Sequence, residues 1–355
     1  MANSPVDWAL AERVAGRFIA REQWSQSYHY RSLEPDFARL TPQAEALVSE
    51  TTGLTSANGL ATAAVISRPD WVKANLSSMQ LLLAPLLAKM EAELSRRNAR
   101  VAAAGAAIAG AEVGAMLGWM SGRVLGQYDL MVGDTATGDC VYYVGPNVLA
   151  LEKRFGFPPS EFRLWLALHE VTHRAQFTGV PWMKAHFLGL VYEILNTVEP
   201  DADTLVAAIK SAVRPGGDRK QIITDGGIMA LLASPAQRAT MGRIGGLMAL
   251  LEGHGDVTMN RAGLGQVPSA QRFDRVLKER RGKGSPVVKV VQKLAGIEAK
   301  MNQYEQGETF IAAIEAVGGD RVVDRCWENP DHLPSLEEIR RPELWLDRLG
   351  VTVSV

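Results

Sequence analysis

The chain has 355 residues, of which 47% are hydrophobic and 22% are charged, with a formal net charge of −1. This is ordinary globular usage, which excludes collagen-like, low-complexity and wholly disordered chains. The balanced charge gives no overall field that would recruit nucleic acid or an anionic membrane. The two cysteines, Cys140 and Cys326, are too few for a disulfide scaffold or a four-cysteine zinc site.

The N-terminal residues Met1 to Trp8 show no basic segment followed by an apolar one. We therefore expect no secretory signal and a cytoplasmic protein. Helical periodicity dominates the chain. Pro85 should kink or break the long helix expected over residues 67–96. In chain order we expect helices over residues 6–20, 42–47, 67–96, 101–121, 160–177, 182–198, 204–213 and 234–259, a helix through 291–304, and one strand over 140–144. Residues after Glu328 should wrap the surface.

Residues 101–121 carry one charge, Glu112, and are long enough to span a bilayer. They consist mostly of Ala and Gly, which gain little from lipid. Five glycines recur every fourth residue and form a stripe along which another helix can approach closely: Gly110, Gly114, Gly118, Gly122 and Gly126. We interpret this segment as a tightly packed helix of a soluble protein, and expect no stable membrane insertion.

The strongest signal is His169-Glu170-x-x-His173 in the middle of a predicted helix. At about 100° per residue the two imidazoles lie about 40° apart and one turn apart, so both can reach one metal ion. Glu170 borders that face without being a natural ligand, which suits a base that takes a proton from metal-bound water. The alternative is a chance match on an amphipathic helix, expected about once in a hundred such sequences.

A zinc site needs a third protein ligand. Glu252 and Asp256 lie four residues apart, so on a helix they face the same way: Glu252 can complete the site and Asp256 can accept a hydrogen bond from the outer N–H of a ligand histidine. His254 points elsewhere unless Gly253 and Gly255 unwind the helix, which would make it the alternative ligand. The alternative is that Glu252 and Asp256 are a solvated acidic pair near a helix end.

These two motifs resemble those of the gluzincin branch of zincin metallopeptidases. More narrowly, the chain is similar to a zincin-like metallopeptidase family of actinobacteria and relatives, part of which is labelled as associated with coenzyme F420 biosynthesis. The resemblance covers nearly the whole chain through Val6-Asp-Trp8, Gly126-Gln-Tyr-Asp129, Val144-Gly-Pro-Asn147, Phe162-Arg-Leu-Trp165, Gly179-Val-Pro-Trp182 and Glu252-Gly-His-Gly-Asp256. Arg174 departs from the wider pattern, in which an uncharged residue follows the second histidine.

The resemblance implies a mainly α fold with a small β element, built around an active-site helix. We expect the chain to divide into an N-terminal helical region, residues 1–128, and a zincin-like catalytic region, residues 129–355, with the two packed as one unit. It implies one zinc ion per chain on His169, His173 and Glu252, with Glu170 as the general base. The function expected is a zinc metallohydrolase acting on a peptide or protein, and the alternative is a non-catalytic zinc-stabilised scaffold or regulatory binding protein.

Three further features are weighed by chemistry alone. Tyr142, Tyr143, His254 and Tyr304 are candidates for stabilising an oxyanion, although each is more typical of core or surface. The strand over residues 140–144 could offer its edge to an extended peptide. The basic residues from Arg272 to Lys283 belong to no known nucleic-acid-binding motif, so we interpret them as a solvated helix end and expect no nucleic-acid partner.

Overall fold

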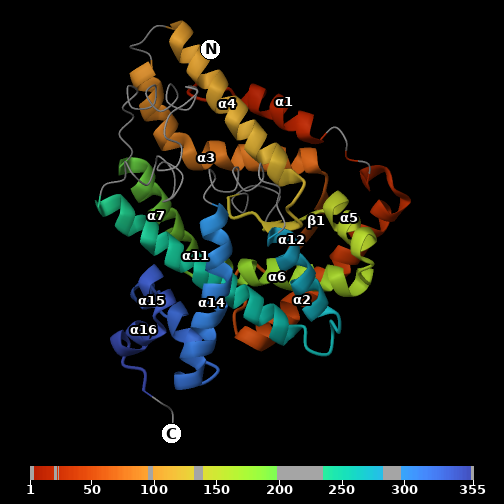
Figure 1. The fold of residues 1–355 in the computed structure, drawn as a ribbon, viewed down its shortest axis with the longest axis vertical. Helices are drawn as coiled ribbons and strands as arrows, with labels where there is room; N and C mark the ends of the chain where they lie inside the picture. The colour runs from red at the N-terminus through yellow and green to blue at the C-terminus, as the bar shows by residue number, and fades with distance from the viewer. Residues whose placement is uncertain are drawn as a thin grey trace. The chain divides into compact units, whose positions relative to one another are not determined.

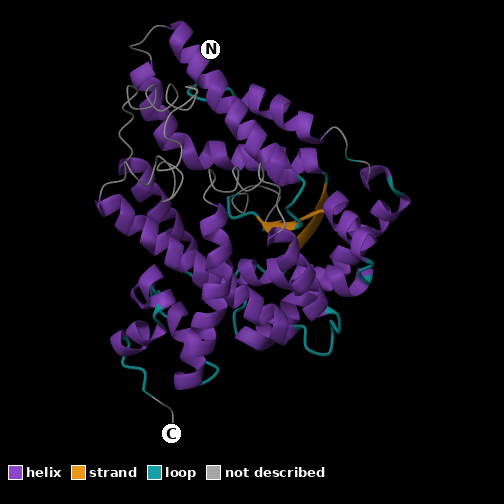
Figure 2. Ribbon diagram, in the orientation of Figure 1, coloured by secondary structure: helices purple, strands orange, loops and turns teal. Residues whose placement is uncertain are grey.

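The computed structural model describes residues 4–19, 22, 24–94, 99–131, 139–197, 235–282 and 297–352. These residues are mostly helical and contain one small sheet (Figures 1 and 2), which confirms the expected fold class. The chain clusters into two compact units. The first comprises Met1–Gly179 and Met259–Phe273, and the second comprises Val180–Thr258 and Asp274–Val355. The division of the sequence at residue 128 coincides with neither unit and stays a prediction.

The first unit contains the N-terminal helices and the helix that bears the histidines. Their bounds are α1 Trp8–Ile19, α2 Leu33–Thr52, α3 Arg68–Leu94, α4 Ala99–Ser121, α5 Gly145–Phe155 and α6 Pro159–Gly179, with short 3-10 turns at Trp24–Gln26 and Tyr28–Ser32. One expectation was wrong: helix α2 begins at Leu33, nine residues before the predicted start at Pro42, because the buried stripe already includes Phe37 and Leu40. Helix α3 continues past Pro85, so the break considered there does not occur, and the kink stays a prediction.

The sheet has the order β1-β3-β2, with β1 at Thr62–Ile66, β2 at Gly126–Tyr128 and β3 at Cys140–Val144. Strand β3 pairs in parallel with β1 and antiparallel with β2. The predicted strand is confirmed, but the expectation that its edge is open to a peptide is wrong because β3 is the central strand. Strands β1 and β2 were not predicted, since three residues and an Ala-rich run carry no clear alternation.

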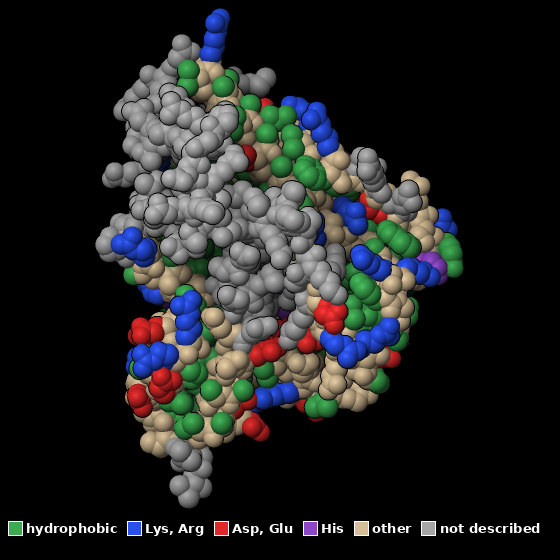
Figure 3. Space-filling view, in the orientation of Figure 1, with side chains coloured by type: hydrophobic (Ala, Val, Ile, Leu, Met, Phe, Trp, Pro, Cys, Tyr) green, Lys and Arg blue, Asp and Glu red, His purple; other side chains and the backbone are tan. Residues whose placement is uncertain are grey.

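Helix α4 ends at Ser121, so Gly122 and Gly126 do not belong to the predicted stripe, and its other three glycines pack on α1. A Cβ on Gly110, Gly114 or Gly118 would overlap the backbone of Asp7, Ala11 or Ala15 respectively, so only glycine permits this approach. Among the described helices, α4 alone is long and apolar enough to cross a membrane, and 28% of its most apolar window is buried. Figure 3 shows hydrophobic side chains over the part of the surface where α1 and α4 lie. A single such helix is weak evidence for a membrane span.

The second unit contains α7 and the C-terminal helices. The bounds are α7 Met183–Thr197, α14 Ile297–Gly318, α15 Leu336–Arg340 and α16 Pro342–Arg348, with 3-10 turns at Val322–Trp327 and Pro330–His332. The tail after Glu328 was expected to wrap the surface, but it also contributes to the core. Trp345 is fully buried, and the centroid of its ring lies 5.7 Å from that of Phe310. The helix expected over 204–213 lies outside the described residues.

Two helices belong to both units. Helix α11 runs from Pro235 to Ala262 and α12 from Ala270 to Gly282, and each crosses a boundary between the units without interruption. In the first unit, a Cβ on Gly263, the residue after α11, would lie 3.5 Å from the Leu168 side chain of α6. The C-terminal end of α11 is therefore placed beside the helix that carries both histidines.

Candidate metal centre

Helix α6 begins at Pro159, immediately after Pro158, and the predicted range 160–177 agrees with the observed one within two residues. Its buried side includes Leu164, Leu168, Val171 and Ala175, as the i, i+4, i+7, i+11 pattern predicts. A helix buried along most of its length presents its remaining side chains in a fixed geometry.

His169 and His173 project from one side of α6 and are half-buried. Their Nε2 atoms lie 3.2 Å apart, and their rings are nearly perpendicular, at 85°. Two nitrogen ligands at about 2.0–2.1 Å from a tetrahedral metal ion are separated by about 3.3 Å. The two imidazoles therefore already stand at the separation that one metal ion requires.

The sequence analysis missed the residue that orients His173. Gln176, three residues further along α6 and fully buried, places its Oε1 atom 3.0 Å from Nδ1 of His173. An acceptor there favours the tautomer with a proton on Nδ1, and this leaves the Nε2 lone pair available to a metal. The spacing of three on a helix is the signal that could have identified Gln176.

Glu252 lies on α11, which stays helical through Glu252-Gly-His-Gly-Asp256. The unwinding considered for Gly253 and Gly255 does not occur. Gly253 is required for another reason: a Cβ there would overlap the backbone at Gly307 of α14, so the two helices meet without intervening side chains. The neighbouring Glu252 is buried, with 7% of its surface exposed.

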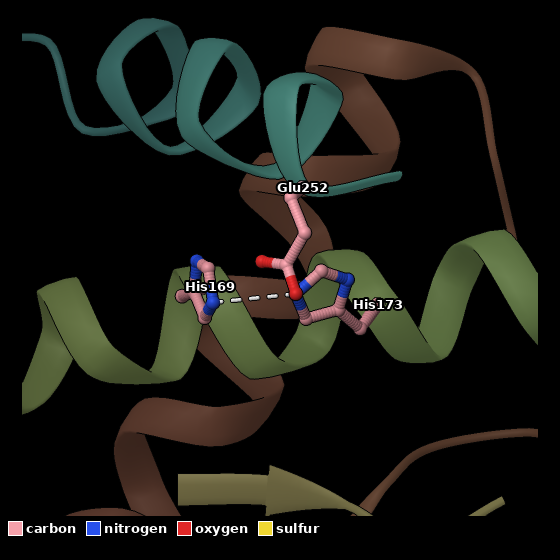
Figure 4. A group of neighbouring side chains, drawn as sticks. All are labelled: His169, His173 and Glu252. Carbon is pink, nitrogen blue, oxygen red and sulfur yellow. Dashed lines mark hydrogen bonds between the residues drawn. The ribbon is translucent and has the colours of Figure 1, made fainter. Parts of the chain in front are cut away.

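The structure brings His169, His173 and Glu252 together. One ligand atom from each lies within 4.8 Å of the other two, and Figure 4 shows the Glu252 carboxylate pointing towards both imidazoles. The 3.2 Å spacing between the two nitrogens fits a tetrahedral ion. These three side chains form a group that could hold a metal ion.

Glu170 occupies the side of α6 that faces β2. It is buried, at 7% exposure, and its Cγ, Cδ and Oε1 atoms lie against the Cα of Gly126. Burial, together with the negative charge of Glu170 and other groups, raises the pKa of the nearby Tyr143. Glu170 is therefore next to the candidate ligand His169 in the sequence, and strand β2 packs against its carboxylate.

The structure does not bring His254 to the group of three. Its ring packs edge-to-face on Trp327 at 5.0 Å, and its Nε2 atom lies 3.5 Å from Oγ1 of Thr258. On a continuous helix His254 is about 200° from Glu252, so it cannot replace Glu252 as a ligand. Asp256 lies one turn beyond Glu252 and is also buried.

Of the tyrosines proposed as oxyanion stabilisers, Tyr143 is engaged by other residues. Tyr143 is fully buried, stacks on Phe37 and shares a 2.9 Å hydrogen bond between its hydroxyl and that of Thr41. Tyr142, the residue before Tyr143 in β3, points to the opposite face of the sheet, away from α6. The side chain of Tyr304 lies outside the described residues.

Arg174, which departs from the wider zincin pattern, is completely buried. Its guanidinium group forms an ion pair with Glu45 of α2 and another with Asp139, at 2.7 Å, and donates to the carbonyl oxygen of Gly59 at 2.7 Å. Near the start of α6, Arg163 pairs with Glu152 of α5 at 2.8 Å and with Asp36 of α2 at 2.5 Å. Buried arginines therefore fix α6 on both sides of the histidines.

The first residue of the basic run has a structural role. Arg272 donates to the carbonyl oxygen of Phe155 at 2.6 Å and to that of Gly156 at 3.4 Å, where α5 ends. A cation that binds the last carbonyls of a helix stabilises its C-terminus. This contact explains the presence of Arg272 without a nucleic-acid partner. That the protein has no such partner stays a prediction.

Two histidines one turn apart on a helix, a carboxylate as the third candidate ligand and a buried glutamate are typical of HExxH metalloproteins. Residues 6–346 match the model of the zincin-like metallopeptidase family. The chain belongs to this family, which confirms the resemblance found in the sequence. Its association with the part of the family linked to coenzyme F420 stays a prediction.

One solved structure is similar over nearly its whole length. It is described as a "putative hydrolase with a novel fold from Chloroflexus aurantiacus", with 28% sequence identity and a TM-score of 0.72, and the match covers 97% of this chain and 99% of that one. No protein among the curated sequences matches this chain. The family and this neighbour together indicate a hydrolase.

Proposed function

We propose that this protein is a zinc-dependent hydrolase that cleaves peptide bonds. In this proposal His169, His173 and Glu252 hold one zinc ion per chain, and Glu170 is the general base. The observation that carries the proposal is the convergence of the three ligand atoms within 4.8 Å, with Glu170 next to His169 in the same helix.

The choice of zinc rests on the donor atoms. Two imidazole nitrogens and one carboxylate oxygen suit zinc, whereas magnesium and calcium prefer oxygen ligands alone. Structural zinc sites are closed by four protein ligands, while catalytic sites have three and leave a position for water or substrate. Three side chains meet here among the described residues, which supports a catalytic site.

The zinc ion, when bound, would supply a Lewis acid that polarises the scissile carbonyl and lowers the pKa of a water molecule. The carboxylate of Glu170 then accepts a proton from this water and delivers it to the nitrogen that leaves. Gln176 keeps the proton of His173 on Nδ1. Asp256, which lies one turn beyond Glu252 on the same helix, would accept a hydrogen bond from the outer N–H of a ligand histidine.

The substrate we propose is an extended peptide segment. Strand β2 is an outer strand of the sheet that the described residues form, and it contacts α6. An outer strand can bind a peptide through backbone hydrogen bonds. Because β3 is the central strand, we assign to β2 the peptide-binding edge that was expected of residues 140–144. The description of the Chloroflexus protein as a hydrolase supports this class of activity.

The experiment that tests this proposal is the substitution Glu170→Gln, assayed against a library of internally quenched peptides. Because Glu170 is not a ligand, the variant should retain the zinc content of the wild-type protein and lose at least about 100-fold in turnover. Undiminished turnover would contradict the role of Glu170. A wild-type protein that holds zinc but cleaves none of the peptides would favour the alternative of a non-catalytic scaffold.

A further inference from the structure

Gly126, the first residue of β2, lies against the carboxylate of Glu170. A Cβ at this position would be 2.6 Å from the Cγ and Oε1 atoms of Glu170 and 2.7 Å from its Cδ atom. Contacts this short do not occur in proteins, so any larger residue would have to displace the glutamate or the strand. Gly126 is not among the glycines with positive φ. It is therefore needed for space and not for its backbone conformation.

Strand β2 is held too firmly to retreat from α6. Gly126 is paired with Tyr143, and the preceding residue, Leu125, accepts a 2.9 Å hydrogen bond from the backbone N–H of Val144. The next residue, Gln127, accepts a hydrogen bond from the Trp71 indole at 2.6 Å. The backbone on both sides of Gly126 is thus fixed by bonds to other elements.

Helix α6 is held equally firmly on its own side. Glu170 lies between Arg163 and Arg174, whose ion pairs with α2 are almost completely buried at the arginine end. Neither the helix nor the strand can yield easily. The Gly126 backbone therefore contacts the Glu170 carboxylate on one side and restricts the rotamers that Glu170 can adopt.

We propose that Gly126 is a positioning residue, which holds the Glu170 carboxylate in the place from which it exchanges a proton with water. This inference rests on the proposed function, because it assigns Glu170 the role of general base. It also explains why glycine stands at the head of Gly126-Gln-Tyr-Asp129. The other three residues contact other partners: Gln127 contacts Trp71, Tyr128 stacks on Phe177, and Asp129 contacts Ser78.

The test is Gly126→Ala, compared with Gly122→Ala. Gly122 lies four residues earlier, and its added Cβ would come no closer than 4.0 Å to the nearest atom. Both variants are made in the wild-type chain and in Glu170→Ala, and their thermal unfolding, zinc content and hydrolysis are measured. The probe for hydrolysis is the internally quenched peptide that the wild-type protein cleaves fastest.

Gly126→Ala should lower the unfolding midpoint by about 2–6 °C in the wild-type chain. Most of this decrease should disappear in Glu170→Ala, where the overlapping atoms are gone. The variant should also bind as much zinc as the wild-type protein and lose about 100-fold in kcat with little change in KM, since a misplaced catalytic group slows the chemical step. Gly122→Ala should change none of these quantities.

Equal destabilisation by Gly126→Ala in the wild-type chain and in Glu170→Ala would overturn the inference, because residue 126 would then not restrict the position of the Glu170 side chain. So would an unchanged kcat in Gly126→Ala when Glu170→Gln is inactive. A wild-type protein that cleaves no peptide would overturn the proposed function and the catalytic meaning of Gly126 together, even if the thermal coupling to Glu170 were found.

Discussion

Helices α6 and α11 supply the candidate ligands, and they are held in place by different forces. Helix α6 is fixed by charge: Arg163 and Arg174 are buried and reach carboxylates on α2 and α5, or beside β3. Helix α11 is fixed by close packing: Gly253 meets Gly307 of α14, and no charged residue interrupts the stretch from Ile244 to Leu251.

This difference determines how each ligand is placed. His169 and His173 need only the local geometry of one helix, so their separation follows from a spacing of four residues. Glu252 depends on how far α11 stands from its neighbour, and the absence of a side chain at Gly253 sets that distance. We infer that the histidine pair is a preformed half-site and that Glu252 is the ligand more sensitive to changes in packing.

The largest expected effect on stability comes from Arg174→Met. This change leaves Glu45 and Asp139 buried without their cation, which should lower the free energy of unfolding by about 3–5 kcal/mol. Denaturation in urea measures it. Arg243→Met is the control, because the ion pair of Arg243 with Glu193 is about half exposed and its loss should change the free energy of unfolding far less. Equal losses in the two variants would show that the buried pairs do not fix α6.

Gly253→Ala should have a smaller effect of a different kind. The added methyl group forces α11 and α14 apart, with an expected loss of about 1–3 kcal/mol in the free energy of unfolding. It should also weaken zinc binding, measured by competition with a chromogenic chelator, because Glu252 is adjacent.

Gly242→Ala on the same helix is the matched control for Gly253→Ala. Nothing lies within 4 Å of a Cβ at Gly242. The substitution should therefore stabilise the protein by up to about 1 kcal/mol through helix propensity and leave the affinity for zinc unchanged. If both glycine variants bound zinc as tightly as the wild-type protein, the packing of α11 would not control Glu252.

Gln176→Met should have the smallest effect. It keeps the volume of the side chain but removes the Oε1 acceptor that orients His173. We expect the affinity for zinc to fall about tenfold, near the lower end of the range for residues that orient a ligand. The fold should persist, as circular dichroism would show. An unchanged dissociation constant for zinc would mean that α6 alone orients His173.

The sequence predicted what depends on local periodicity. The long helices, strand β3 and the positions of His169, Glu170 and His173 on one helix all follow from spacing along the chain. Glu252 was also identified, because its spacing from Asp256 is helical and the resemblance to gluzincins singled it out. The alternative ligand, His254, was kept only because glycines flank it, and the structure uses Gly253 for a helix contact instead.

The sequence could not reveal features that join distant segments. Strand β2 is too short to carry a pattern, so neither the central place of β3 nor the contact between Gly126 and Glu170 could be foreseen. Arg174 was noted as unusual, but its partners Glu45 and Asp139 are remote in the chain. The packing of Trp345 against Phe310 was missed for the same reason.

The central claim is that two histidines of α6 and one glutamate of α11 bind the same ion. Metal analysis of the protein purified without chelator tests it most directly, with His169→Ala and Glu252→Ala measured alongside. The account predicts about one zinc ion per chain in the wild-type protein and a strong reduction in both variants. Equal metal content in all three proteins would contradict it.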